Sequence, residues 1–99
     1  LGVQVAQLTD QMAEFLGIPG REGVLILETL ATTPAEAAGL QAGDVILSVN
    51  GQAVSSPSEL IRSLSEGENE IEIAREKVVS NLQVILGGDE LASDDALEM

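Results

Sequence analysis

Acidic side chains are the most numerous groups in this 99-residue sequence that could do chemistry, with 17 Asp and Glu against four Lys and Arg. Two sets could be paired carboxylates for acid–base catalysis: Glu68, Glu70 and Glu72, and Asp94 with Asp95. Such a pair needs a pocket or a charged partner to act, and the sequence indicates neither. We therefore interpret the first set as a solvated face and the second as a tail. Asp44, which follows a glycine, is interpreted as a turn and capping residue.

Serine and cysteine nucleophiles cannot be activated within this chain. It contains no histidine, which is the usual general base at neutral pH and the commonest metal ligand. It also contains no cysteine, so disulfides and thiolate metal sites are excluded. Ser55 and Ser56 therefore have no histidine to take their protons. The sequence predicts that this chain by itself is not an enzyme and that it binds no metal or cofactor.

The formal net charge of −13 restricts the possible partners. Nucleic acids and anionic lipid surfaces would be repelled, and Phe15, the single aromatic residue, offers no platform for stacked bases. The longest apolar run is far below the roughly 20 residues that cross a bilayer. Leu1 is not an initiator methionine before a basic segment. We expect no nucleic-acid partner, membrane insertion or signal peptide, and we interpret the chain as a fragment of a longer protein.

The elements that would position a binding site are clearest in residues 38–51. Four backbone signals follow one another there: Gly39 as a helix end, Gly43-Asp44 as a turn, residues 45–49 as a strand and Asn50-Gly51 as a reversal. A residue without Cβ closes a helix in the left-handed conformation at little cost. Aliphatic and β-branched residues favour a buried strand, and an Asn-Gly pair is the strongest short signal for a hairpin. The segment therefore predicts a helix end, a turn, a strand and a reversal.

A helix near the N-terminus is predicted from its cap and its apolar spacing. Thr9 can cap a helix that runs to Leu16 and is ended by the glycine and proline that follow. Met12, Phe15 and Leu16 have the i, i+3, i+4 spacing of one helix face. We expect this face to cover the sheet.

A second helix begins in the run Ser56-Pro57-Ser58-Glu59. Serine at the cap, proline at the first helical position and glutamate three residues after the cap are a complete helix-start signature, in which the glutamate bonds back to the cap. Its apolar residues are Leu60, Ile61 and Leu64, and we expect Gly67 to end the helix.

Five segments have strand patterns: residues 1–5, 24–30, 45–49, 70–74 and 78–86. Residues 70–74 alternate between acidic and apolar side chains, as in a strand with one exposed face. Short polar connections favour antiparallel neighbours. Together with the helices, the strands predict an α+β domain built on a small and mainly antiparallel sheet.

These segments resemble the PDZ domain of the bacterial HtrA/Do-type, DegP-like serine protease family. Residues 33–51 resemble its central signature, and residues 8–24 resemble its L-T-x-x-x-A-x-x-L-G-[IL]-P…G-V segment. Residues 1–5 resemble its carboxylate-binding loop and ligand-pairing strand. The resemblance implies a PDZ domain over residues 1–86: a five- to six-stranded, partly open barrel or sandwich with two to three helices. Residues 87–99 are interpreted as a flexible acidic tail.

The resemblance also implies a peptide-binding groove between strand 1–5 and helix 57–64. Backbone amides at the start of the strand would hold a ligand's terminal carboxylate, and the glycine there would leave room for it. The implied peptide-binding residues are Leu1, Gly2, Val3, Gln4, Val5, Pro57, Ile61 and Leu64. Val3 would form the floor of the pocket for the last ligand side chain, and Val5 with Pro57 would line the next subsite. Leu60 would point into the core.

Other interpretations of these residues remain open. From the pattern alone, Val3, Ile61 and Leu64 could simply be core residues. Arg62 and Arg75 could steer the ligand carboxylate or could face solvent. The tail ends in Leu97-Glu98-Met99, a flexible segment that finishes in an apolar side chain and a free carboxylate, which is the kind of ligand that the groove should accept.

The resemblance implies a substrate-recognition or regulatory module of an envelope protease, located in the periplasm or cell envelope. Its partners would be hydrophobic C-terminal or unfolded peptides, bound by strand addition, and the protease domain of the parent chain, which would serve in protein quality control. The alternative is a scaffold or assembly PDZ domain that takes no part in proteolysis, such as that of a secretion-system component.

Overall fold

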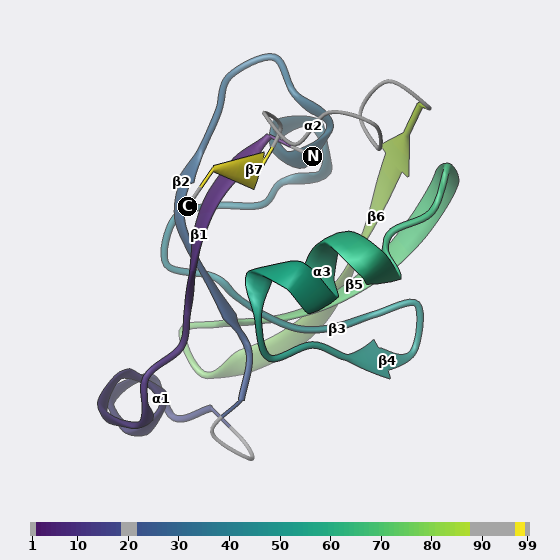
Figure 1. Cartoon of the computed structure of the whole chain (residues 1–99). Helices are drawn as coiled ribbons and strands as arrows, with labels where there is room; N and C mark the ends of the chain where they lie inside the picture. The colour runs from purple at the N-terminus through teal and green to yellow at the C-terminus, as the bar shows by residue number, and fades with distance from the viewer. Residues whose placement is uncertain (1, 19–21, 88–96, 99) are drawn as a thin grey trace.

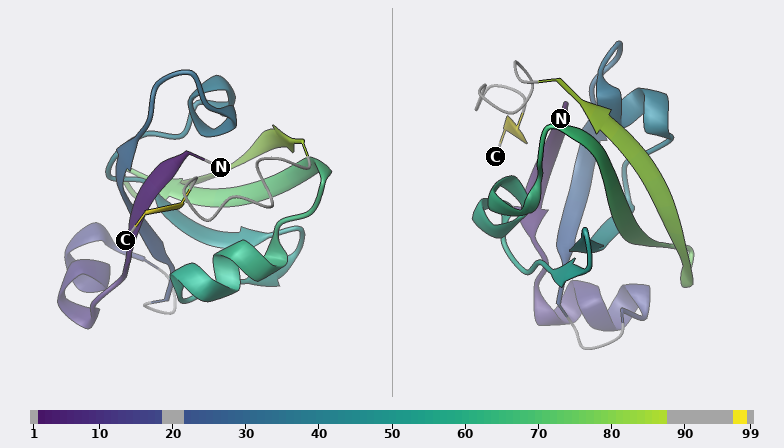
Figure 2. Two further views of the ribbon diagram at one scale, coloured as in Figure 1. Left: turned by 45° about the horizontal axis from the view of Figure 1, so that its top comes forward. Right: turned by 90° about the vertical axis from the view of Figure 1, so that its right-hand side faces the viewer.

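A computed structural model describes residues 2–18, 22–87 and 97–98 of the chain. Its elements are β1 (Val3–Gln7), α1 (Asp10–Leu16), β2 (Val24–Thr29), α2 (Pro34–Ala38), β3 (Val45–Val49), β4 (Gln52–Ala53), α3 (Pro57–Ser63), β5 (Gly67–Arg75), β6 (Val78–Leu86) and β7 (Leu97–Glu98). The sheet order is β6-β5-β3-β2-β1-β7, and β4 pairs with β3. The sheet curls into a partly open barrel, with α1 and α2 at opposite ends and α3 beside β1 (Figure 1, Figure 2). The predicted α+β architecture is confirmed.

The predicted hairpin at Asn50-Gly51 is confirmed. Val49 pairs with Gln52, and the two residues between them have φ angles of 52° and 84°. A two-residue turn of this type needs positive φ at both central positions, because only then does its twist match that of the two strands. The turn adds the short strand β4, which the strand patterns do not predict.

Helix α3 starts where the sequence predicts and ends earlier. Ser56 caps it by accepting a hydrogen bond from the Glu59 backbone N–H at 3.2 Å. The helix ends at Ser63, and Leu64 follows in an extended conformation with φ −79° and ψ 147°. The prediction that Gly67 ends the helix is therefore wrong. Gly67, with φ +94°, instead begins β5, where the positive φ turns the chain into the strand.

Two apolar clusters lie on the two faces of the sheet. The larger fills the barrel and includes the fully buried Ile26, Ile46, Leu60, Ile71 and Ile73. The smaller lies beneath α1 and joins its Ala13 to Leu8, Ile18, Val45 and Ala74. Both clusters are small, so the placement of each element depends on additional contacts.

The helix face predicted to cover the sheet is wrong for α1. Met12 and Phe15 are exposed, with 37% and 78% of their surface accessible, whereas Ala13 is buried and Leu16 partly buried. Leu8 before the helix and Ile18 after it also belong to the small cluster, so α1 packs on the sheet through the side that carries Ala13. A small side chain such as alanine lets the helix axis approach the sheet closely, and the larger side chains turn outward.

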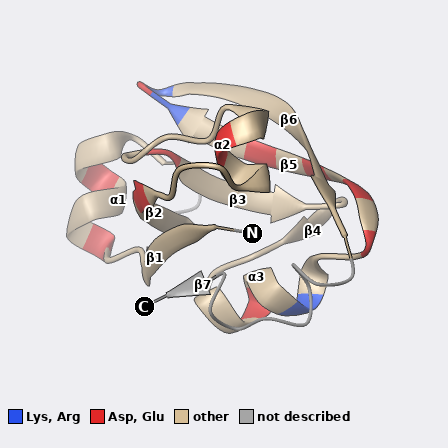
Figure 3. Cartoon of the chain, turned by 90° about the horizontal axis from the view of Figure 1, so that it is seen from above, with Lys and Arg blue, Asp and Glu red and all other residues tan. Residues whose placement is uncertain are grey.

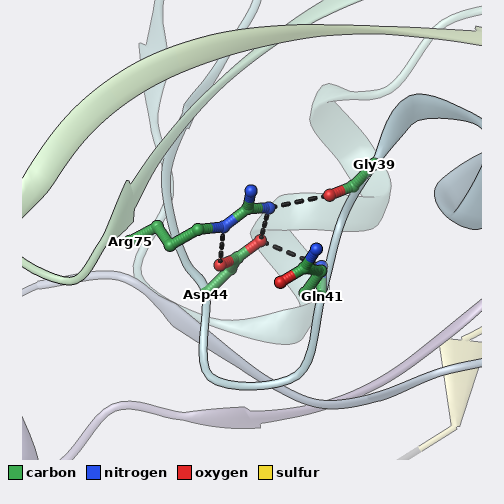
Figure 4. Close-up of polar contacts among 4 residues, drawn as sticks. All are labelled: Gly39, Gln41, Asp44 and Arg75. Carbon is green, nitrogen blue, oxygen red and sulfur yellow. Dashed lines mark hydrogen bonds and ion pairs between the residues drawn. The ribbon is translucent and has the colours of Figure 1, made fainter.

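An ion pair ties three segments together at one end of the barrel (Figure 4). Asp44, 1% exposed, accepts hydrogen bonds from Arg75 Nε at 2.8 Å and Arg75 Nη2 at 2.6 Å. It also accepts one from the Gln41 backbone N–H at 2.9 Å, which confirms its predicted turn-capping role. Arg75 Nη2 donates to the Gly39 carbonyl at 2.7 Å. The hydrogen bonds to Asp44 raise the pKa of Arg75. Arg75 therefore joins the end of α2 and the start of β3 to the end of β5, while 37% of its side chain stays exposed to solvent.

Replacing Arg75 tests how much this ion pair contributes to the stability of the domain. Arg75→Met leaves the buried carboxylate of Asp44 without its cation. Because the Arg75 side chain itself is 37% exposed and screened by solvent, we expect the free energy of unfolding to fall by about 2 kcal/mol. Arg62→Met is the matched control, because Arg62 is exposed on α3, and should change it by less than about 0.5 kcal/mol. Urea unfolding followed by circular dichroism measures both. Equal effects of the two substitutions would contradict this role.

Candidate functional site

Strand β1 lies between β2 and β7, with its apolar side chains committed to the barrel. Val3 and Val5 are 0% and 1% exposed and belong to the large cluster. Gln4 lies between them and pairs with Glu28 of β2. A bulge between Gln4 and Val5 shifts the register, so that Val5 pairs with Ile26. The interpretation of Val3 as a core residue is therefore confirmed. A ligand that paired with β1 would approach Val3 from the outer edge of the barrel.

The glycine before β1 is required by a close approach of α2. Gly2 has φ +95°, and a Cβ built on it would lie 2.3 to 2.5 Å from three side-chain atoms of Thr33. Thr33 caps α2 and donates from its Oγ1 to the Leu30 carbonyl at 2.8 Å. The Gly2 carbonyl in turn accepts from the Leu30 N–H at 2.8 Å. The structure thus gives a different reason for this glycine from the predicted one, which was room for a ligand.

The apolar residues of helix α3 and its C-cap are buried to different extents. Leu60 is 0% exposed, whereas Ile61 and Leu64 are partly buried and pack against the large cluster. The predicted orientation of Leu60 into the core is confirmed. Arg62, on the same helix, is exposed.

The N-terminal end of α3 is held by the residues before it. The carboxylate of Glu59 accepts hydrogen bonds from the Ser55 N–H at 2.9 Å and from Ser55 Oγ at 2.6 Å. The side-chain bond is the larger cause, and together these bonds lower the pKa of Glu59. The prediction that Glu59 bonds back to the capping residue is therefore wrong by one position, because the carboxylate reaches past Ser56 to Ser55.

The free edge of β1 is occupied by residues from the end of the chain. Val3 pairs with Leu97 and Gln4 with Glu98, in parallel orientation (Figure 1, Figure 2). Strand β7 thus runs from the Gly2 end of β1 toward Val5. A ligand whose terminal carboxylate meets the amides near Gly2 would run in the opposite direction. Residues 88–96 and Met99 of the predicted tail lie outside the described residues.

The structure brings most of the predicted site residues to two neighbouring elements. Gly2 and three residues of β1 lie on one side, and three residues of α3 or its C-cap on the other: Val3, Gln4 and Val5, and Pro57, Ile61 and Leu64. Leu1 lies outside the described residues. Two side chains whose role the sequence interpretation missed lie at the end of α3: Asn50 donates to the Ser63 carbonyl, and Asn69 accepts from the N–H of Ser65, the residue after the C-cap. The signal for Asn69 was an amide on the apolar side of the alternating strand, whereas Asn50 was interpreted only as a turn residue.

Within the described ranges, no group of three His, Cys, Asp or Glu residues is arranged to hold a metal ion. Nor does any helix in this part of the chain have the length and apolar character to span a membrane. A recess of about 290 Å³ lies between α1 and the β5–β6 turn, lined among others by Phe15 and Lys77. It is separate from β1 and α3.

Sequence comparisons place the chain among known proteins. A family profile described as PDZ domain matches residues 29–75. A probable periplasmic serine endoprotease DegP-like from Pseudomonas putida (strain GB-1) is 37% identical over 100 residues, covering 97% of this chain and 20% of the relative. The magnetosome formation protease MamE of Magnetospirillum gryphiswaldense is 34% identical over 97 residues, covering 94% of this chain and 13% of the relative. The chain spans about a fifth or less of the length of these relatives.

Solved structures show the same fold. The HtrA-type protease AlgW with a decapeptide aligns with a TM-score of 0.72 and 31% identity, over 88% of this chain and 28% of that one. The HtrA3 PDZ domain bound to a phage-derived ligand aligns with a TM-score of 0.74 over 86% of this chain and 82% of that one, and its 23% identity supports the fold alone. The profile, the relatives and the fold agree, and the chain belongs to the PDZ domain family, as a PDZ domain of the kind found in DegP-like, HtrA-type serine proteases.

Proposed function

We propose that this PDZ domain binds extended peptide segments by strand addition to β1, with apolar ligand side chains against α3. The observation that carries the proposal is the pairing of β7 with β1, because it gives this edge a partner strand in the molecule itself. Main-chain hydrogen bonds of such an edge supply affinity, and neighbouring side chains supply selectivity. Relatives of known structure that are named as peptide-bound support the same proposal.

A ligand with a free carboxylate would run antiparallel to β1. Its carboxylate would lie at the backbone amides around Leu1, Gly2 and Val3, since clustered N–H groups bind an anion without a charged side chain. Its last side chain would rest between Val3 and Ile61, with Leu64 beside it. Further along, Val5 and Pro57 would line the next subsite. Gln4, which lies between Val3 and Val5 in β1, would pair with the ligand through its backbone.

The parent protein is proposed to be a trypsin-like serine endopeptidase of protein quality control, in which this module recognises substrates or regulates the protease domain. The relatives above are named as proteases, which favours this proposal over a scaffold without proteolysis. The described residues contain no histidine, and the proposed role is binding without catalysis. The location is the periplasm, as the names of the DegP-like relatives state. Residues 1–86 form the proposed folded unit and residues 87–99 an acidic segment, of which β7 pairs with β1.

Hydrophobic C-terminal peptides should bind with a Kd of roughly tens to hundreds of micromolar. A short peptide adds about four backbone hydrogen bonds and one apolar anchor, and ordering it offsets much of that gain. Titration monitored by amide chemical shifts should perturb residues 2–5 and 57–64. Shifts confined to another surface, such as the recess beside α1, would refute the assignment of the groove.

Two aspartate substitutions on α3 separate binding from folding. Ile61→Asp places a carboxylate beside that of the ligand, so affinity should fall at least tenfold, about 1.4 kcal/mol, while the domain stays folded. Leu60→Asp places an unpaired charge in the core and should unfold the domain. Peptide titration and circular dichroism measure the two effects. The reverse outcome would show that Ile61, rather than Leu60, supports the core.

Strand β7 should compete with added peptides. A tethered segment has an effective concentration of about millimolar when its linker spans the distance, so removing it should lower the apparent Kd of a peptide by roughly twofold to tenfold. Deletion of residues 88–99 also removes acidic charge. The matched variant is therefore the double substitution Leu97→Pro and Glu98→Pro, which abolishes ladder hydrogen bonds and keeps most of the charge. Unchanged affinity in both variants would exclude competition by β7.

A further inference from the structure

Asn69 is a polar residue in the large core. The exposed Glu68 and Glu70 flank it, whereas Asn69 itself is 0% exposed and shares the inner face of β5 with Ile71 and Ile73. Burying an amide costs free energy unless its hydrogen bonds are satisfied. An apolar residue would avoid that cost, so the partners of this amide are informative.

The hydrogen bonds of Asn69 converge on the connection between α3 and β5. Its Oδ1 accepts from the Ser65 N–H at 2.8 Å, from Ser65 Oγ at 3.2 Å and from Asn50 Nδ2 at 2.9 Å. Its Nδ2 lies 2.8 Å from the Ser65 carbonyl, 3.1 Å from that of Gly67 and 3.4 Å from that of Val84. One side chain therefore holds the residue that follows the helix C-cap by its N–H, hydroxyl and carbonyl groups.

Asn50 extends this contact to the last residue of α3. Besides Asn69, its Nδ2 donates to the Ser63 carbonyl at 3.3 Å. Its Oδ1 accepts from the Glu70 N–H at 2.9 Å, and its own N–H donates to the Glu70 carbonyl at 2.8 Å. The rigid β3–β4 turn, through Asn50, is thus joined to both α3 and β5.

The contacts matter because the end of α3 has no glycine cap of its own. Leu64 leaves the helix in an extended conformation, and the last carbonyls of a helix need partners from elsewhere. Asn50 supplies one to the Ser63 carbonyl, and Asn69 holds Ser65, the residue after the C-cap. Ser55 and Ser56 hold the N-terminal end. The groove-side residues Ile61 and Leu64 lie between the two fastened ends.

We propose that Asn69 and Asn50 are positioning residues of the peptide-binding groove, which hold the C-terminal end of α3 in register with β1. The assignment rests on the proposed function of the groove. Apolar packing alone is not directional and would let a two-turn helix shift along the core, whereas hydrogen bonds fix its end to the sheet. The alternative is that the two amides stabilise the whole domain uniformly.

Two turns of the domain give a matched pair of variants. Asn50 and Glu76 are each the first residue of a two-residue hairpin turn, and both have φ 52°. Glycine accepts this conformation without strain, so Asn50→Gly and Glu76→Gly change the backbone alike. Only the first removes hydrogen bonds to α3 and Asn69, since Glu76 follows the last residue of β5 and Asn69 is near its start.

Hydrogen exchange tests the positioning role directly. In Asn50→Gly, the amides of residues 60–64 should exchange about tenfold faster, whereas those in the centres of β3 and β5 should keep their protection. The Kd for a hydrophobic C-terminal peptide should rise about fivefold, the loss of roughly one buried hydrogen bond. Glu76→Gly should leave both quantities within about twofold. Uniformly faster exchange throughout the sheet, or unchanged exchange in α3, would overturn the inference.

A second variant covers the case in which Asn50→Gly fails to fold. Asn50→Asp keeps the acceptor for the Glu70 N–H and a residue suited to the turn, and it replaces the donor to Ser63 and Asn69 with a carboxylate oxygen that faces those two acceptors. It should loosen residues 60–64 in the same way, and unchanged protection there would overturn the inference. If the unaltered domain binds no peptide, the proposed function fails, while the exchange comparison still decides whether the two amides position α3.

Discussion

The constraint on which the molecule depends is the outer edge of β1. The side chains of Val3 and Val5 are buried inside the barrel, so the strand cannot turn away, and the edge that does not pair with β2 needs another partner. An exposed edge of this kind invites association with other chains, and proteins usually cover or interrupt it. Here the covering segment is β7, which has only two residues. A cover of only two residues is consistent with the peptide binding proposed for this edge.

Directional polar contacts place the elements that the small core cannot place. The Arg75–Asp44 pair joins α2, β3 and β5 at one end of the barrel, and the Asn50–Asn69 pair joins α3, β5 and the β3–β4 turn at the other. Both pairs are largely buried at one partner, where hydrogen bonds are costly to leave unmade. Acidic residues predominate in the rest of the chain, and Figure 3 shows several along β5, where Glu68 and Glu70 are exposed. Such a surface repels anionic partners.

Much of the fold followed from local signals in the sequence. Glycine, asparagine and capping residues act over a few positions, so the Asn50-Gly51 reversal, the Ser56 cap and the strands in residues 45–49 and 78–86 could be predicted. The orientation of Leu60 into the core was implied by the resemblance to the PDZ family, and its burial confirms it. The absence of histidine and cysteine, which limits the chemistry, is also a property of the sequence alone.

Only the tertiary structure decided which groups meet across the chain. The sequence placed Phe15 on the covering face of α1, but the helix packs through Ala13, because Leu8 and Ile18 at its two ends determine its rotation. Arg75 finds Asp44 from 31 positions away, and Gly2 is required by Thr33 of a different element. Likewise, the sequence of a two-residue strand does not indicate that β7 pairs with β1 in the parallel direction. Sequence patterns report the conformation that each residue prefers, whereas contacts between distant residues depend on how the sheet curls and brings its edges together.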